Sequence, residues 1–317
     1  MKQERHGQLC GLAAALLFGC SAPLISTLTG RGSALSIAGL LYAGAALALL
    51  SVRVLKGVAH DETSVQRRDA PALAGLIGLG GIVGPVALVL GLARLPAAAS
   101  SLLLNLESVF TLAIAVLVGR EHLGPRGATA AALTIAGTVV LSDGSLSGAN
   151  GMGVALIALA TLAWGIDNNL SQRLSLRDPL QIACFKALGA SLPMLLLARA
   201  LGHAFPPAPI ALVLLLIGAL GYGLSLWLDL LALRELGAAR EAVIFSAAPF
   251  VGAVFSVAVL RDPLTLNLVV AAGLMGAGVV LLLREEHRHW HHHQALRHAH
   301  RHRHDPRAGD LHHEHEH

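Results

Sequence analysis

Charged residues are scarce in this chain. Asp, Glu, Lys and Arg make up 13% of its 317 residues, whereas they make up about a quarter of a typical soluble domain. Hydrophobic residues account for 55%, and the mean hydropathy is +0.66. So few charges cannot cover a water-facing surface. The composition therefore excludes an ordinary soluble protein and predicts an all-α integral membrane protein.

Cysteines and catalytic motifs are also sparse. Cys10, Cys20 and Cys184 all lie in apolar stretches without CxxC or paired spacing, so we expect small buried side chains rather than disulfides or a metal site. GxSxG and P-loop patterns are missing, and no HExxH pattern occurs within the apolar runs. The chain is therefore not expected to be an enzyme or to require a cofactor. Its net charge of +4 does not indicate nucleic acid as a partner.

Three glycines, Gly78, Gly80 and Gly84, imitate a dinucleotide-binding pattern. They lie inside an apolar run with no preceding strand, so the context of that motif is missing. Glycines are common where helices pack closely in lipid. We therefore predict close helix packing at these positions.

Apolar runs long enough to cross about 30 Å of hydrocarbon as a helix occur ten times. We expect the first to be a retained helix rather than a signal peptide, because no small-residue cleavage site leads into polar sequence. The predicted spans lie near 8–28, 35–54, 72–93, 97–118, 125–142, 151–171, 179–199, 209–233, 237–260 and 264–283.

Basic residues between the runs are distributed asymmetrically. One side has 18 Lys and Arg, including both termini, and the other has 4. The positive-inside rule then predicts cytoplasmic N- and C-termini, which requires an even number of spans. We expect a multi-pass protein of a bacterial inner (plasma) membrane, in contact with lipid.

The chain contains an internal repeat. An offset of 141 aligns residues 95–123 with 236–264, and an offset of 146 aligns Phe18-Gly19 with Trp164-Gly165. This divides the chain into a five-helix half at 7–143, a second at 151–283, and a tail at 284–317. Five is odd, so the second half is predicted to be inverted, as in many secondary transporters.

Further motifs are the acidic residues Glu121 and Asp262, the aromatic-Gly pairs Phe18-Gly19 and Trp164-Gly165, and Ala247-Ala248-Pro249. Together with the ten spans in two halves, they resemble the EamA-type family of the drug/metabolite transporter superfamily, over about residues 7–283. The resemblance implies helices 1–4 and 6–9 around a cavity, with helices 5 and 10 outside it. It also implies alternating-access transport, here expected as export, of a small metabolite or drug-like solute. Ser108 departs from the Pro that often follows the acidic residue in the family.

Polar residues inside the predicted spans are candidates for solute binding or coupling. A charge at the bilayer centre costs about 2.5–3.5 kcal/mol on insertion scales, so it is usually paired or faces a cavity. Glu107, whose repeat position is Ala248, is too deep to reach the interface. Asn105 lies about 200° around the helix from it. The full set is Asn105, Glu107, Asp167, Asn168, Asn169, Lys186 and Asp229.

Structural alternatives stay open for three of these sites. Asp167 and its two following asparagines are also compatible with an interfacial helix end. Lys186 is compatible with snorkelling, and Asp229 with capping or pairing with Arg234. Our hypothesis places Glu107 at a central cavity in a network with Lys186 and Asp167. A desolvated carboxylate there would exchange protons and couple transport to the proton gradient.

The tail is rich in histidine, with 13 of the chain's 17 from His287 onward. Such a tract lacks a core-forming pattern and is expected to be disordered, and neutral imidazoles bind Ni, Co, Zn and Cu ions. A divalent-metal transporter, a metal-regulated transporter and a non-transporting metal sensor are therefore alternatives, and a homodimer is left open. The candidate metal ligands are His289, His291, His292, His293, His298, His300, His302, His304, His312, His313, His315 and His317.

Overall fold

A computed structural model describes residues 2–56, 63–118, 124–142, 148–174 and 177–283. Its regular structure within these ranges is helical, apart from an isolated bridge between Thr63 and Arg177, which confirms the all-α expectation. The elements other than two short 3₁₀ turns are α1 Lys2–Ser26, α2 Ala34–Lys56, α3 Ala70–Gly75, η3 Leu76–Val83, α4 Gly84–Leu92, α5 Ala97–Leu103, α6 Leu106–Leu117, α7 Pro125–Leu141, α8 Gly148–Gln172, α9 Pro179–Ala200, α10 Ala208–Ile217, η4 Gly218–Leu224, α11 Ser225–Leu236, α12 Ala238–Phe245, α13 Ala248–Ala258 and α14 Leu266–Leu283.

Membrane-spanning length is reached by nine helical stretches in the described part of the chain. The remaining predicted span, 125–142, corresponds to a shorter apolar helix of 17 residues, Pro125–Leu141. At 1.5 Å per residue it is about 26 Å long, a few ångströms less than an average hydrocarbon core. The multi-pass membrane character is confirmed, while the count of ten and the cytoplasmic termini stay predictions.

Four of the predicted spans are not the continuous helices that their hydropathy suggested. The spans at 72–93 and 209–233 contain the π-helical turns η3 and η4. The spans at 97–118 and 237–260 are broken, at residues 104–105 and 246–247 respectively. The π turns and the breaks fall at equivalent repeat positions, within one residue of the offset of 141. The two halves therefore share their local irregularities as well as their sequence pattern.

Different residues produce the two breaks. In the second half, Pro249 has no N–H to donate to the Phe245 carbonyl, so the helix restarts at α13. In the first half Ser108 replaces the proline, yet the break is present. Asn105 Nδ2 donates to the Leu102 carbonyl at 2.8 Å, and Ser108 Oγ donates to the Asn105 carbonyl at 2.7 Å. These side chains compete with backbone donors and interrupt the ladder.

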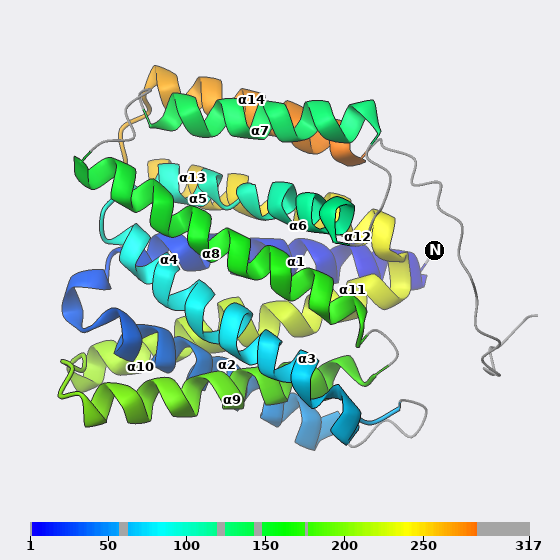
Figure 1. The fold of residues 1–317 in the computed structure, drawn as a ribbon, viewed down its shortest axis with the longest axis vertical. Coiled ribbons are helices and arrows are strands. Elements are labelled where there is room, and N and C mark those ends of the chain that lie inside the picture. The colour runs from blue at the N-terminus through cyan, green and yellow to red at the C-terminus, as the bar shows by residue number, and fades with distance from the viewer. Residues whose placement is uncertain (1, 57–62, 119–123, 143–147, 175–176, 284–317) are drawn as a thin grey trace, which may run out of the picture. The chain divides into compact units, whose positions relative to one another are not determined.

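Helices from the two halves pack against one another. The main pairs are α1 with α11, α2 with α9, and both α4 and α6 with α8, while α7 and α14 lie side by side (Figure 1). The crossing of α2 over α10 and η4 is especially close. A Cβ at Gly44 would overlap the Leu215 carbonyl oxygen, and one at Gly218 would overlap the Leu41 carbonyl oxygen. Small residues here set the approach of the two halves, as in membrane helix pairs generally.

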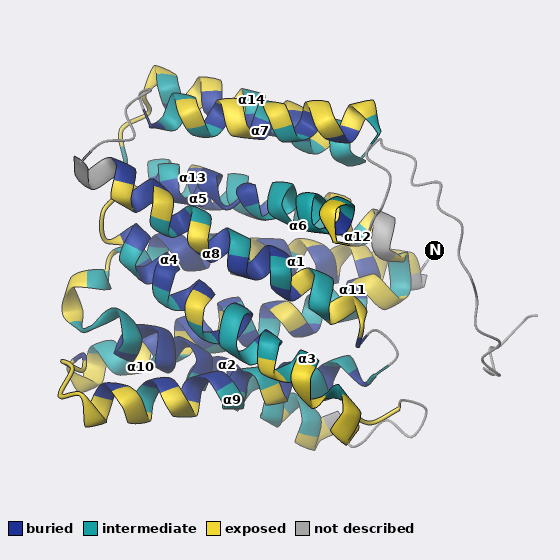
Figure 2. Cartoon of the chain, viewed as in Figure 1, coloured by how far each residue is buried: buried dark blue, intermediate teal, exposed yellow. Residues whose placement is uncertain are grey.

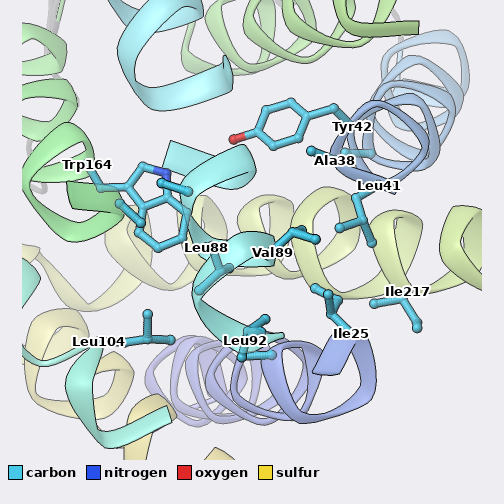
Figure 3. Close-up of a cluster of buried hydrophobic side chains, with 14 of the residues drawn as sticks. Ile25, Ala38, Leu41, Tyr42, Leu88, Val89, Leu92, Leu104, Trp164 and Ile217 are labelled. Carbon is cyan, nitrogen blue, oxygen red and sulfur yellow. The ribbon is translucent and has the colours of Figure 1, made fainter. Parts of the chain in front are cut away.

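Burial follows the same arrangement. Buried residues concentrate on the inner faces of α1, α2, α4 and α8, and α7 and α14 carry many exposed positions (Figure 2). The exposed residues include large apolar side chains such as Leu117, Leu196 and Leu266, which are 81%, 69% and 76% exposed. Figure 3 shows part of the core, where Leu88, Val89 and neighbouring side chains fill the space between helices. An apolar exterior around a packed interior is what a lipid-facing bundle requires.

Candidate functional site

A cavity of about 250 Å³ lies among the helices. Its lining comes from both halves of the chain, and α7 and α14 do not contribute to it. This agrees with the expectation that the spans at 125–142 and 264–283 lie outside the cavity. The side chains that matter most are of two kinds, charged or amide groups and aromatic rings. They are Glu107, Asp167, Asn168, Lys186 and Asp229, together with Phe18, Tyr42, Trp164, Tyr222 and Phe245.

Lys186 of α9 and Asp167 of α8 form an ion pair. Lys186 Nζ lies 2.5 Å from Asp167 Oδ2, and the two side chains are 22% and 8% exposed. The ammonium therefore points into the bundle rather than along α9 toward the interface. A buried pair of this kind compensates two charges that would each be costly alone. The structure thus brings together two residues that the hypothesis placed in one network.

Gly80 makes room for this pair. Its Cα faces the Asp167 carboxyl group so closely that a Cβ would overlap Asp167 Oδ1. The Gly80 carbonyl accepts hydrogen bonds from Tyr42 Oη and Trp164 Nε1, both at 3.0 Å. Figure 3 shows these two rings reaching toward each other from α2 and α8. The close-packing prediction holds at Gly80, and also at Gly84, which faces Trp164, while Gly78 has open space around it.

The matching glycine of the second half, Gly221, makes a related contact. A Cβ there would come within 2.7 Å of Ser21 Cβ. The offset of 141 aligns Gly80 with Gly221, and the offset of 146 aligns Ser21 with Asp167. The two contacts therefore occupy equivalent places in the two halves. The scaffold is repeated, whereas the charge is present on one side only.

Glu107 lies in α6, two residues after the break between α5 and α6, and lines the cavity. Its Oε1 accepts a hydrogen bond from Asn168 Nδ2 at 2.8 Å. The following Asn169 is committed to backbone, because its Nδ2 donates to the Thr111 and Gly165 carbonyls at 3.1 and 2.8 Å. Asn105 is 5% exposed and serves the helix break described above. Of the predicted polar set, Asn105 and Asn169 are therefore structural neighbours of the cavity rather than part of its lining.

Asp229 also lines the cavity, on α11. Its Oδ1 is buried without a hydrogen-bond donor among the described residues. The group that it faces is another carboxyl, Glu241 of α12, which is within hydrogen-bonding reach. Sequence reasoning missed Glu241, although it lay inside the predicted span at 237–260 and was the only acidic residue there.

Metal ligands cannot be assigned in the bundle. In the described ranges no three His, Cys, Asp or Glu residues are grouped so as to hold a metal ion. The predicted ligands between His289 and His317 lie outside the described residues, as does Glu121.

Comparison with known proteins identifies relatives over most of the chain. The model of the EamA-like transporter family matches residues 5–143 and 151–284. An uncharacterized transporter of Methanothermobacter thermautotrophicus is 26% identical over 293 residues, which cover 87% of this chain and 85% of the relative. A solved crystal structure shares the fold with a TM-score of 0.64 at 20% identity, covering 87% of this chain and 97% of the other.

Proposed function

The chain belongs to the EamA-like transporter family, and from this premise we propose that it is a secondary transporter that exports a small organic cation through the central cavity. The cargo is a metabolite or drug-like molecule that joins a positive charge to an apolar or aromatic part. The protein works in a bacterial plasma membrane by alternating access, coupled to protons.

The observation that carries the choice of solute is the chemistry of the cavity wall. Three carboxyl groups, on Glu107, Asp167 and Asp229, face one ammonium group, on Lys186. Aromatic rings from both halves complete the wall, and a ring face attracts a cation by about 0.5–2 kcal/mol, most where water is excluded. Excess negative charge and rings together favour a cation over an anion or a neutral solute. The cavity volume of about 250 Å³ limits the cargo to small molecules.

Export is supported by the position of the charged groups along their helices. Asp167 lies five residues before Gln172, the end of α8, and Asp229 lies seven before Leu236, the end of α11. Lys186 lies seven residues after Pro179, the start of α9. All three helix ends are predicted to be cytoplasmic by the distribution of basic residues. The charged part of the cavity is therefore closer to the compartment from which an exporter loads.

Alternating access requires contacts that break as the halves move. Two ion pairs connect segments at the predicted cytoplasmic ends, Arg53 with Asp178 at 3.1 Å and Arg177 with Asp69 at 2.7 Å. The π turns and helix breaks, which occur in both halves, offer places where helices bend without unfolding. We propose that opening toward the cytoplasm separates these pairs while the helices flex at the breaks.

Counterflow in proteoliposomes tests the proposal. Labelled benzyltrimethylammonium is the probe, because it combines an aromatic ring with a permanent positive charge. Glu107→Gln keeps the size of the side chain and removes its charge, so the apparent affinity should fall at least about tenfold, or ~1.4 kcal/mol. Glu235→Gln is the matched control, since Glu235 pairs with His6 outside the cavity lining.

Saturable exchange by the wild type, retained in Glu235→Gln and weakened in Glu107→Gln, supports cation transport through this cavity. The proposal is contradicted if the wild type does not exchange the probe, or if Glu107→Gln exchanges it as well as the wild type does.

A transition-metal role is the second candidate, and the histidines from His287 onward favour it. The tail would act as a buffer, a loading platform or a sensor that regulates transport. Uptake of Ni, Co, Zn and Cu ions into vesicles, by the full chain and by a chain ending at Leu283, separates these roles from cation export. Metal uptake that depends on the tail favours the metal role, and metal-independent counterflow favours the organic cation.

A further inference from the structure

The pair of carboxyl groups on Asp229 and Glu241 has no counterpart in the rest of the cavity. Asp167 is matched by the Lys186 ammonium, and Glu107 accepts a hydrogen bond from the Asn168 amide. Asp167 and Asp229 each have one buried carboxylate oxygen without a donor among the described residues. Asp229, however, has no ammonium beside it like that of Lys186, and its close neighbour is a second acid. Two ionised carboxylates would repel each other, and neither has a hydrogen to donate. The contact is favourable only when one of them holds a proton.

Two cations near the pair, Arg240 and Lys186, are engaged elsewhere. On α12, Arg240 binds Glu4 of α1 at 2.9 Å. On α11, Arg234 also takes part in an interaction, while the side chain that contacts Asp229 is Glu241. Lys186, across the cavity, is bound to Asp167. Among the side chains that the structure describes, the elements packed against α11 and α12 carry six other titratable groups. They are Arg5, His6, Cys10 and Cys20 of α1, Tyr222 of η4 and Glu235 of α11 itself.

None of these groups changes the charge of the pair. His6 is 60% exposed and is held by Glu235, at 2.9 Å. Tyr222 is neutral in the physiological range, as are thiols in apolar surroundings. The negative charge of the pair is therefore balanced by a proton or by whatever enters the cavity, since Asp229 belongs to the cavity wall.

We propose that Asp229 and Glu241 form the proton-binding site of the transporter, sharing one proton that leaves when an organic cation occupies the cavity. A cation near Asp229 stabilises the second negative charge, and the shared proton in turn weakens cation binding. This competition produces antiport. Binding of a cation releases the shared proton, and a new proton binds to the pair once the cation has left. The assignment rests on the proposed function for its cargo, and it moves proton exchange from Glu107 to the second half of the chain.

Infrared difference spectroscopy tests the shared proton without any cargo. A protonated carboxyl group has a carbonyl stretch that a carboxylate lacks. In the lipid-reconstituted wild type at neutral pH we expect this band, and we expect its loss in both Asp229→Asn and Glu241→Gln. The side-chain amide introduced by Glu241→Gln would still donate to Asp229, so that variant should fold. Glu235→Gln is the control that should keep the band. A wild type without the band, or variants that retain it in full, would overturn the assignment.

Proton release tests the coupling. Benzyltrimethylammonium carries no exchangeable proton, so any acid that appears in weakly buffered solution on its addition comes from the protein. We expect about one proton per bound cation in the wild type and in Glu235→Gln, and none in Glu241→Gln, although that variant still binds the probe. Binding without proton release in the wild type overturns the coupling and leaves cation transport standing. A wild type that does not bind the probe contradicts the cargo and the coupling together, while the infrared result still decides whether the pair holds a proton.

Discussion

Replacing Gly80 by alanine isolates the contact on which the ion pair of the cavity depends. A Cβ at this position would overlap the carboxyl group of Asp167 and come within 2.8 Å of its Cβ. The obstacle includes the start of the side chain, which cannot rotate away. Asp167 must therefore shift on α8, and its Oδ2 must leave the Lys186 ammonium, which it now contacts at 2.5 Å.

The size of the effect follows from two opposing contributions. Breaking a buried ion pair costs about 3–5 kcal/mol, because an uncompensated charge remains. Alanine is intrinsically more helix-stabilising than glycine, by about 1 kcal/mol. The net loss of stability expected for Gly80→Ala is therefore about 2–4 kcal/mol.

Gly78→Ala provides the matched control. Gly78 belongs to the same π turn, and a Cβ there would meet nothing within 4 Å. It should be neutral or stabilising by up to about 1 kcal/mol. Reversible unfolding of both variants in mixed detergent micelles measures the difference. Equal stability of Gly80→Ala and Gly78→Ala would refute the claim that Gly80 positions the Asp167–Lys186 pair.

Two further predictions concern packing and the carbonyl of Gly80, beside the transport and proton-release experiments described above. Gly44→Ala should destabilise the protein strongly, because the new Cβ would meet the backbone carbonyl of Leu215 rather than a movable side chain. Gly273→Ala in α14 is the control, since a Cβ there has open space and should not destabilise the protein. Unfolding in mixed micelles compares the two variants. Tyr42→Phe and Trp164→Phe each remove one of the two donors to the Gly80 carbonyl and should cost about 1 kcal/mol. The double variant should cost more than their sum, since it leaves that carbonyl unpaired; additive losses in the same assay would contradict this.

Local composition was sufficient to predict the membrane class and the approximate spans. Hydropathy adds up over neighbouring residues, so it does not depend on how helices pack. Hydropathy did not predict the places where side chains interrupt the backbone hydrogen bonds of a helix. The break beside Asn105 arises from hydrogen bonds of Asn105 and Ser108, and the same residue types occur inside unbroken helices elsewhere. Without a proline the break had no sequence signal.

The polar candidates were predicted as a set, but their partners were not. Each helix has a face that periodicity can predict, provided that the helix is regular. A π turn inserts one extra residue and rotates everything after it by about 100°. Asp229 lies after η4, so its direction could not be projected from the first part of its span. Its neighbour Glu241 lies in the next helix, α12, so the periodicity of a single helix could not predict that the two residues meet.

The amino-acid sequence by itself determined that this is a multi-pass helical membrane protein, with a repeat at an offset of 141 and with Glu107 where the repeat has Ala248. Those properties depend on composition and order alone. The tertiary structure decided which charges meet. Lys186 with Asp167, Asn168 with Glu107, and the two acids at Asp229 and Glu241 come together because glycine contacts, π turns and helix breaks set the rotation and approach of the helices.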